Sequence, residues 1–252
     1  MGRRTQADDP SPARPPTVAR RSWRRRAGTL LAAALVLTVV LGAAVWQLTP
    51  SVSDAQARIA SRLAAVGATD PGALPVPDPV GQAVIATEDA TFTSNPGLSA
   101  SGIYRYLTAP ITGNAGSATL EQQLAKILYS DGSQSLPAQA EDAVLALELD
   151  ATYSKEQLLQ MYLAAVYFGH GYYGLPAAAR GYFGLAPADL SWAQASLLAG
   201  LVQAPTAYDP LVHLDLATSR QGHVLDRLVA TGVLTTPQAD TARTAPLDLQ
   251  HH

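Results

Sequence analysis

A run of 20 residues without a charged side chain, Thr29 to Leu48, constrains this chain more than any other feature of its sequence. An α-helix of that length is about 30 Å long, which matches the hydrocarbon core of a bilayer. Five arginines directly precede the run, and such a cluster predicts that this side stays in the cytoplasm. We therefore predict a single-pass protein of the cell membrane. Residues 1–28 form a basic, disordered cytoplasmic tail, residues 29–48 form a transmembrane signal anchor, and the body of the protein is extracytoplasmic.

A cleaved signal peptide is the alternative interpretation of the same segment. Gly42-Ala43-Ala44 offers a cleavage site of the small-x-small type. However, the apolar run is long for a signal peptide, and 28 residues precede it. We favour a retained anchor, and a mature protein that begins near Val45 would contradict that choice.

Charge is distributed unevenly along the chain, and the distribution argues against some classes of partner. The first 28 residues hold eight arginines and two aspartates, whereas the rest of the chain carries nine basic and eighteen acidic side chains. Nucleic-acid binding requires clustered cations, so we expect no nucleic-acid partner for the acidic body of the protein. The absence of cysteine excludes a disulfide scaffold, zinc ribbons and thiol catalysis.

Helix signals dominate the sequence after residue 50. Ser51 or Ser53 is placed to cap a helix that ends just before Gly67. Residues 67–79 are rich in proline and glycine, so residues 49–79 are predicted to form a stalk helix and a linker. The spacing of a capping box recurs at three further helix starts, namely Thr119 with Gln122, Ser154 with Gln157, and Ser191 with Gln194.

Two longer helices complete the prediction of the fold class. Pro137 is placed in the first turn of a helix over residues 138–152, and Gly232 follows a helix over residues 216–230. No stretch longer than a few residues alternates apolar and polar side chains as a half-buried strand does. We predict a mostly α, single-domain body over residues 80–246.

Glu88 and Asp89 are the first candidates for chemistry. They end an apolar stretch, and apolar surroundings raise the pKa of a carboxyl group toward values that suit a general base. A solvated helix end is the simpler interpretation of the same acidic pair.

The segment 113–129 is the second candidate. It leads from a glycine-rich loop into a helix, and the free N–H groups of a helix start, followed by Lys126, suit a phosphate. Under the alternative interpretation, Gln122 only completes the capping box with Thr119.

Read in order, these segments resemble the peptidoglycan glycosyltransferases of glycosyltransferase family 51. This family includes the transglycosylase domains of class A penicillin-binding proteins and the monofunctional enzymes. Its first motif, E-D-x-x-F-x-x-H-x-G, resembles residues 88–97 and is followed by Arg105 at the motif's arginine. Its second motif, G-x-S-T-x-T-Q-Q-L-x-K-N, resembles residues 116–127. Later motifs resemble residues 162–184 and 190–210, and Arg220 falls at the arginine of R-x-x-x-V-L.

The resemblance covers about residues 78–245 and implies a lysozyme-like α fold that polymerises lipid II, a lipid-linked disaccharide-peptide, into glycan strands. It implies Glu88 as the general base that deprotonates the acceptor hydroxyl, with Asp142 as the second catalytic carboxylate. Mg²⁺ or Mn²⁺ is an implied cofactor at the pyrophosphate, near Glu88 or Asp142 and with no ligand set assigned. The implied substrate- and pyrophosphate-binding residues are Lys126, Gln122, Gln123, Arg105, Thr119 and Asn95. The implied partners are lipid II, the growing glycan strand, the membrane and other proteins of cell-wall synthesis.

The departures from the family motifs fall on polar positions. Asn95 stands at the histidine of the first motif, Glu121 at a threonine of the second, and Asp142 at the glutamate of a third motif, R-K-x-x-E. Ala138 and Gln139 replace the two cations of that third motif. We expect Glu121 to place a repulsive negative charge near the phosphate site. Two alternatives to an active synthase therefore stay open, a catalytically silent lipid II-binding scaffold and, less favoured, a hydrolase of the same fold.

Overall fold

The computed structural model describes residues 26–30, 32–33, 36, 40, 49–72, 75–99, 118–130 and 136–250, without the side chains of residues 136 and 137. Most of the predicted cytoplasmic tail, most of the predicted membrane span, and Arg105 lie outside these residues. Among the residues that are described, no helix is both long and apolar enough to cross a bilayer. The chain divides into two units, Met1–Leu48 and Thr49–His252, and the second contains every element considered below.

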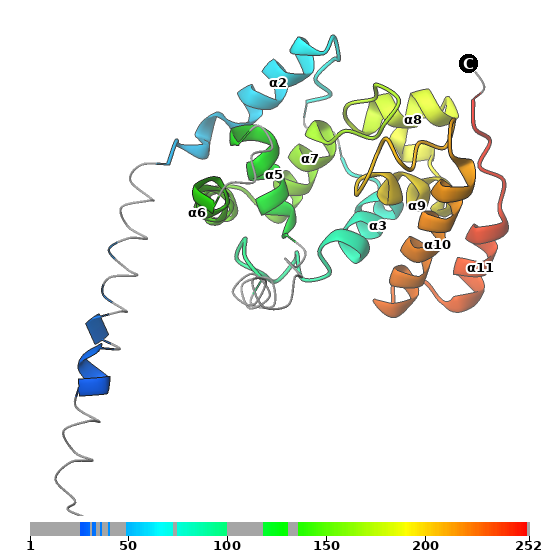
Figure 1. Ribbon diagram of the computed structural model, residues 1–252. Coiled ribbons are helices and arrows are strands. Elements are labelled where there is room, and N and C mark those ends of the chain that lie inside the picture. Colours follow the sequence, from blue (N-terminus) through cyan, green and yellow to red (C-terminus); the bar gives the residue numbers. More distant parts are fainter. Residues whose placement is uncertain are drawn as a thin grey trace, which may run out of the picture. The chain divides into compact units, whose positions relative to one another are not determined.

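The second unit is built from helices (Figure 1). In the described part of this unit, strand-like pairing is limited to one antiparallel bridge between Tyr167 and Tyr173, which confirms the predicted mostly α class. The helices are α2 (Ala55–Ala65), α3 (Asp78–Glu88), α5 (Leu120–Tyr129), α6 (Leu136–Thr152), α7 (Lys155–Ala165), α8 (Leu175–Phe183), α9 (Trp192–Leu201), α10 (Leu214–Ala230) and α11 (Thr236–Thr244), with 3-10 turns at η1 (Val52–Asp54) and η2 (Pro187–Asp189).

The predicted helix starts are confirmed where the signal is local. Each of the three capping boxes forms, at the starts of α5, α7 and α9. Ser51 caps η1, which leads into α2, and Gly67 follows α2 with a positive φ of 69°. Two boundaries differ slightly, since α6 begins at Leu136 and α10 begins at Leu214, two residues before the predicted start. The predicted boundaries of the stalk and of the body at residue 80 stay predictions.

Helix α9 lies in the core of this unit. Nine of its ten residues are buried, and a helix that is apolar on all sides belongs in a core. It packs against α3, α10 and α11, whereas α5 packs against α6 and α7. Figure 1 shows α5 and α6 in green apart from the yellow-to-red helices α9 to α11. Helix α3 belongs with α9 and α10, and its last residue, Glu88, contacts a side chain of α5.

Candidate active site

Glu88 receives contacts from two helices that are distant from it in the sequence. Gln123 of α5 donates from Nε2 to Glu88 Oε2 at 3.3 Å. Arg220 of α10 places Nη2 3.8 Å from Glu88 Oε1. Tyr162 of α7 donates its hydroxyl hydrogen to Gln123 Oε1 at 2.7 Å. Because the phenol occupies the amide oxygen, the amide nitrogen of Gln123 is the end that faces the carboxylate.

Burial is the main influence on the pKa of the Glu88 carboxyl. The Glu88 side chain is 13% exposed, and desolvation raises the pKa of its carboxyl above the ordinary value, with Gln123 and Arg220 opposing that rise. This is the direction that the apolar sequence around Glu88 predicts. Burial, together with the charge of Glu88, holds the pKa of Tyr162 well above its ordinary value, so Tyr162 stays a hydrogen-bond donor. A carboxyl group with a raised pKa suits proton transfer near neutral pH.

Arg220 is a functional candidate that the sequence analysis missed. Its side chain is 18% exposed, and its Nε has no hydrogen-bond partner within the described residues. A side chain at Gly200 of α9 would place a Cβ only 3.0 Å from Arg220 Cγ, so this glycine leaves space for the arginine. Tyr162 was missed as well. Neither residue lies near Glu88 along the chain, so only the family motifs that these positions match could have identified them.

Asp142 lies on α6 in a second cluster. Its side chain is buried and accepts a hydrogen bond from Ser130 Oγ, just after α5. Burial raises the pKa of the Asp142 carboxyl, while Ser130 and the positive charge of Lys126 lower it and Glu141 raises it further. Lys126 itself makes no hydrogen bond or ion pair within the part of the chain that is described.

Helix α5 connects the two clusters. Gln123 and Lys126 are three residues apart, and residues with this spacing share a helix face. One face of α5 therefore carries the amide that contacts Glu88 and the ammonium that lies near Asp142. Of the predicted site residues, the structure links Glu88 with Gln123, Asp142 with Lys126, and Gln122 with Thr119.

Three other predicted binding residues have side chains engaged in local structure. Gln122 accepts at Oε1 from the Thr119 backbone N–H at 3.0 Å and so completes the capping box. Thr119 donates from Oγ1 to the Gly97 carbonyl at 2.6 Å. Asn95 donates from Nδ2 to Asp89 Oδ2 at 2.9 Å, and its Oδ1 accepts from the Gly97 N–H. The structure thus shows a structural use for each, and their contact with substrate stays a prediction.

The adjacent acidic residues have different surroundings. Asp89 is buried and accepts hydrogen bonds from Thr91, from Asn95 and, at 3.3 Å, from the Leu120 N–H that begins α5. Its carboxylate therefore joins the loop after α3 to the first turn of α5. Glu88 is left as the member of the pair that is available for chemistry.

The expected repulsion from Glu121 is wrong. This side chain is fully buried, and its Oε1 pairs with Lys155 Nζ at 2.6 Å. Along a helix, Glu121 points about 140° away from Lys126, because five residues turn the chain by about 500°. Its charge is therefore both neutralised and directed away from the expected phosphate site.

A divalent cation fits the described residues poorly. They contain no group of three or more side chains of histidine, cysteine, aspartate or glutamate that could hold a metal ion. Both candidate carboxylates also have a cationic neighbour, Arg220 for Glu88 and Lys126 for Asp142. The predicted Mg²⁺ or Mn²⁺ therefore stays a prediction, and no chemical step below depends on it.

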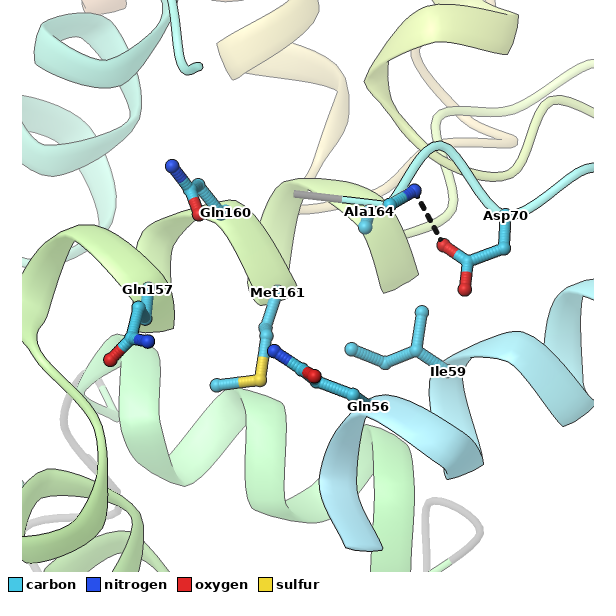
Figure 2. A pocket seen from close by; sticks show the side chains of 8 residues that line it. Gln56, Ile59, Asp70, Gln157, Gln160, Met161 and Ala164 are labelled. Atoms are coloured by element: carbon cyan, nitrogen blue, oxygen red, sulfur yellow. Dashed lines mark hydrogen bonds between the residues drawn. The ribbon is translucent and has the colours of Figure 1, made fainter. Parts of the chain in front are cut away.

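A pocket of about 120 Å³ lies elsewhere, between α2 and α7 (Figure 2). Ile59 and Met161 form its apolar wall, and Asp70 at its edge accepts a hydrogen bond from the Gly72 N–H at 2.9 Å. Its other lining residues are Gln56, Gln157, Gln160 and Ala164. The lining of this pocket includes no residue of the Glu88 or Asp142 cluster.

Comparison with known proteins gives a consistent result. A family model described as Transglycosylase matches residues 68–229. Penicillin-binding protein 2a of Streptococcus pneumoniae is 39% identical over 172 residues, which are 68% of this chain and 23% of that protein. Penicillin-binding protein 1A of Escherichia coli is 32% identical over 180 residues, 70% of this chain and 21% of that protein. The crystal structure of penicillin-binding protein 1A from Haemophilus influenzae aligns with a TM-score of 0.43 and 20% identity, over 69% of this chain and 17% of that one. The chain thus spans less than a quarter of the length of these relatives.

Proposed function

This chain belongs to the transglycosylase family, and from that premise we propose that it is a peptidoglycan glycosyltransferase. Its substrate is lipid II, which it polymerises into glycan strands with release of undecaprenyl pyrophosphate. The observation that carries the proposal is the buried Glu88 carboxyl, with its raised pKa, held by Gln123 and Arg220. A lysozyme-like architecture for residues 80–246 is part of the same proposal.

Glu88 is the general base of the proposed reaction. A hydroxyl of the acceptor sugar attacks the anomeric carbon of the donor sugar, and Glu88 takes the hydroxyl proton. A new carbon–oxygen bond forms between the sugars, and the bond from the anomeric carbon to the pyrophosphate oxygen breaks with its electron pair on that oxygen. The hydrogen bonds from Tyr162 to Gln123 and from Gln123 to Glu88 orient the carboxylate for this transfer.

Lys126 is the cation that we assign to the leaving pyrophosphate. Negative charge develops on the phosphate oxygens as the bond breaks, and a fixed cation stabilises that charge. Lys126 lies on the same face of α5 as Gln123, and its side chain is only partly buried, which supports this assignment. Arg105 is proposed for the same role on the strength of the family motif.

The proposed location is the cell membrane, with the N-terminus in the cytoplasm and the catalytic body outside. A lipid-linked substrate is itself held in the bilayer, and the apolar run at residues 29–48 would keep the enzyme beside it. Protease added to intact spheroplasts should digest the body and spare the first 28 residues or so. A mature chain that begins near Val45 would contradict the retained anchor. Other proteins of cell-wall synthesis are proposed partners.

A lipid II-binding scaffold is the second candidate function. Asp142 favours it, because the carboxylate is one methylene shorter than the glutamate of the family motif and accepts a hydrogen bond from Ser130. The positions of the two motif cations are uncharged in this chain. A scaffold would bind the precursor and release no product.

One assay separates the candidates. The purified full chain is incubated in detergent micelles with labelled lipid II, with and without Mn²⁺, and in parallel with preformed glycan. Formation of glycan chains supports the glycosyltransferase, and binding without product supports the scaffold. Cleavage of the preformed glycan would instead point to a hydrolase.

A further inference from the structure

Lys155 uses its whole hydrogen-bonding capacity on three separate segments. Its Nζ lies 2.6 Å from Glu121 Oε1 in the first turn of α5, 2.7 Å from the Asn95 carbonyl in the loop after α3, and 2.7 Å from Asp150 Oδ1 near the end of α6. An ammonium has three N–H donors, so one donor is available for each acceptor. The same ammonium lies 4.8 Å from the centre of the buried Phe92 ring.

Glu121 depends on this lysine. The carboxylate is fully buried, and its Oε2 has no hydrogen-bond partner within the described residues. Burial raises the pKa of Glu121, the hydrogen bond and charge of Lys155 lower it, and the nearby charge of Asp89 raises it. A buried carboxylate without a counter-charge is strongly unfavourable, so Glu121 and Lys155 form an interdependent pair.

Two of the three segments that Lys155 joins, α5 and the loop after α3, position Gln123 and Glu88. Glu88 directly precedes the loop that contains Asn95, and Gln123 lies two residues after Glu121 on α5. Two further hydrogen bonds join the same segments, from the Leu120 N–H to Asp89 and from Thr119 Oγ1 to the Gly97 carbonyl. The donors of those two hydrogen bonds are uncharged, whereas Lys155 donates from a positively charged ammonium.

We propose that Lys155 is a positioning residue for Glu88. By bridging Glu121 and the Asn95 carbonyl, its ammonium fixes the spacing between α5 and the loop after α3 that the Gln123–Glu88 hydrogen bond requires. Glu121 is then the charged partner that this arrangement uses, in place of the threonine of the family motif. The expected effect of Lys155 on turnover rests on the proposed glycosyltransferase function. Its expected effect on the position of Gln123 and on the titration of Glu88 does not.

The test follows the titration of Glu88 in four forms of the full chain in detergent micelles. These are the wild type, Lys155→Met, the double variant Glu121→Gln/Lys155→Met, and Asp150→Asn. The Glu88 carboxyl signal is followed by carbon NMR after selective labelling and is assigned with Glu88→Gln. Stability is measured by urea unfolding of the same samples. Asp150→Asn is the matched control, since it removes the negative charge from a contact of similar length that leads to α6 and not to α5.

Lys155→Met should move the midpoint of the Glu88 titration to higher pH. In the wild type, the hydrogen bond from Gln123 lowers the pKa of Glu88, and a displaced Gln123 loses that effect. The charge of Arg220 and the neutral phenol of Tyr162 also face Glu88 and are unchanged by the substitution. If the wild type is active, the turnover of Lys155→Met should fall about 2- to 10-fold, the effect of one weakened hydrogen bond. Asp150→Asn should keep the wild-type midpoint.

The double variant separates positioning from simple stability. Glu121→Gln removes the unpaired buried charge, so the double variant should be more stable than Lys155→Met and should fold even where the single variant does not. The bridge to α5 is still absent, so the raised midpoint should persist. An unchanged midpoint in Lys155→Met or in the double variant, or an equal shift in Asp150→Asn, overturns the proposal. A wild type that forms no glycan contradicts the proposed function alone, because the titration still decides the role of Lys155.

Discussion

The two carboxylate clusters that α5 connects differ in how closely they keep the family pattern. The first, the Glu88 cluster, consists of Glu88, Gln123, Tyr162 and Arg220, and its side chains come from four helices. The second, the Asp142 cluster, consists of Asp142, Ser130 and Lys126, and its members lie on α5, just after it, or on α6. In both, burial raises the pKa of the carboxyl group. The Glu88 cluster retains its family residues. In the Asp142 cluster, the aspartate is shorter than the glutamate of the family motif, and the two motif cations are replaced by uncharged residues.

This difference suggests which step of the proposed reaction has kept its family residues. The proposed proton transfer to Glu88 requires an oriented carboxylate, and Gln123 and Tyr162 are present to orient it. Stabilisation of the leaving group depends on positive charge, and that is where charges are missing at Ala138 and Gln139. We infer that this chain retains the base and has weakened leaving-group stabilisation. The predictions that follow test this contrast, from the largest expected effect to the smallest.

Glu88→Gln should have the largest effect. The amide keeps the shape of the carboxylate and cannot accept the acceptor's proton, so turnover should fall about 10²- to 10⁴-fold with lipid II binding nearly unchanged. The measurement is polymerisation of labelled lipid II beside a binding assay. Glu156→Gln, at an exposed position of α7, is the control that should retain wild-type turnover. A Glu88→Gln variant with full activity would exclude Glu88 as the base.

Lys126→Ala should have the next largest effect. Removal of a charge-assisted contact to pyrophosphate costs about 1.5–3 kcal/mol, a loss of roughly 10- to 150-fold in turnover or affinity. The fold should be unaffected, because the side chain is only partly buried and makes no ion pair within the described residues. Circular dichroism checks the fold, and Arg180→Ala at an exposed position of α8 is the control. Unchanged affinity and rate would leave Lys126 as an ordinary surface lysine.

Restoring the residues of the family motif at the Asp142 cluster should raise the turnover of lipid II. Asp142→Glu extends the carboxylate, and Ala138→Arg returns one cation of the third motif. Together they should increase turnover about 2- to 10-fold, the value of one ordinary net hydrogen bond. The same double substitution in a Glu88→Gln background should give no gain. If the wild type is silent and neither the restoration nor Mn²⁺ produces glycan, the scaffold function is the one supported.

The smallest expected effect concerns stability at neutral pH. The pKa of Glu88 is raised by burial in the folded state, so between its ordinary value and its folded value the native protein binds the extra proton. Stability from this group is therefore fully present below the ordinary value and is lost as the pH rises through the folded value. Glu88→Gln should remove this decline, so the variant should gain stability over the wild type as the pH rises to neutral. Urea unfolding across pH 4 to 8 measures it, and parallel curves would contradict the burial argument.

Local interactions explain why helix positions could be predicted so well. A capping box joins residues three positions apart, so Thr119 with Gln122 and Ser154 with Gln157 fix their helix starts without help from the rest of the chain. The mostly α class follows from the same signals. The motifs also placed Glu88, Gln123, Lys126 and Asp142 among the candidate residues before any contact was known.

Long-range packing decided which side chains those residues contact. Gln123 meets Glu88 across 35 residues, and Tyr162 meets Gln123 across 39. No helical or turn period encodes such contacts, since they arise only when α3, α5 and α7 pack. Glu121 shows the limit most clearly, because the motif led us to expect a repulsive charge near the phosphate site. The folded chain buries it completely, since the ammonium of Lys155, 34 residues further on, supplies the counter-charge that burial requires.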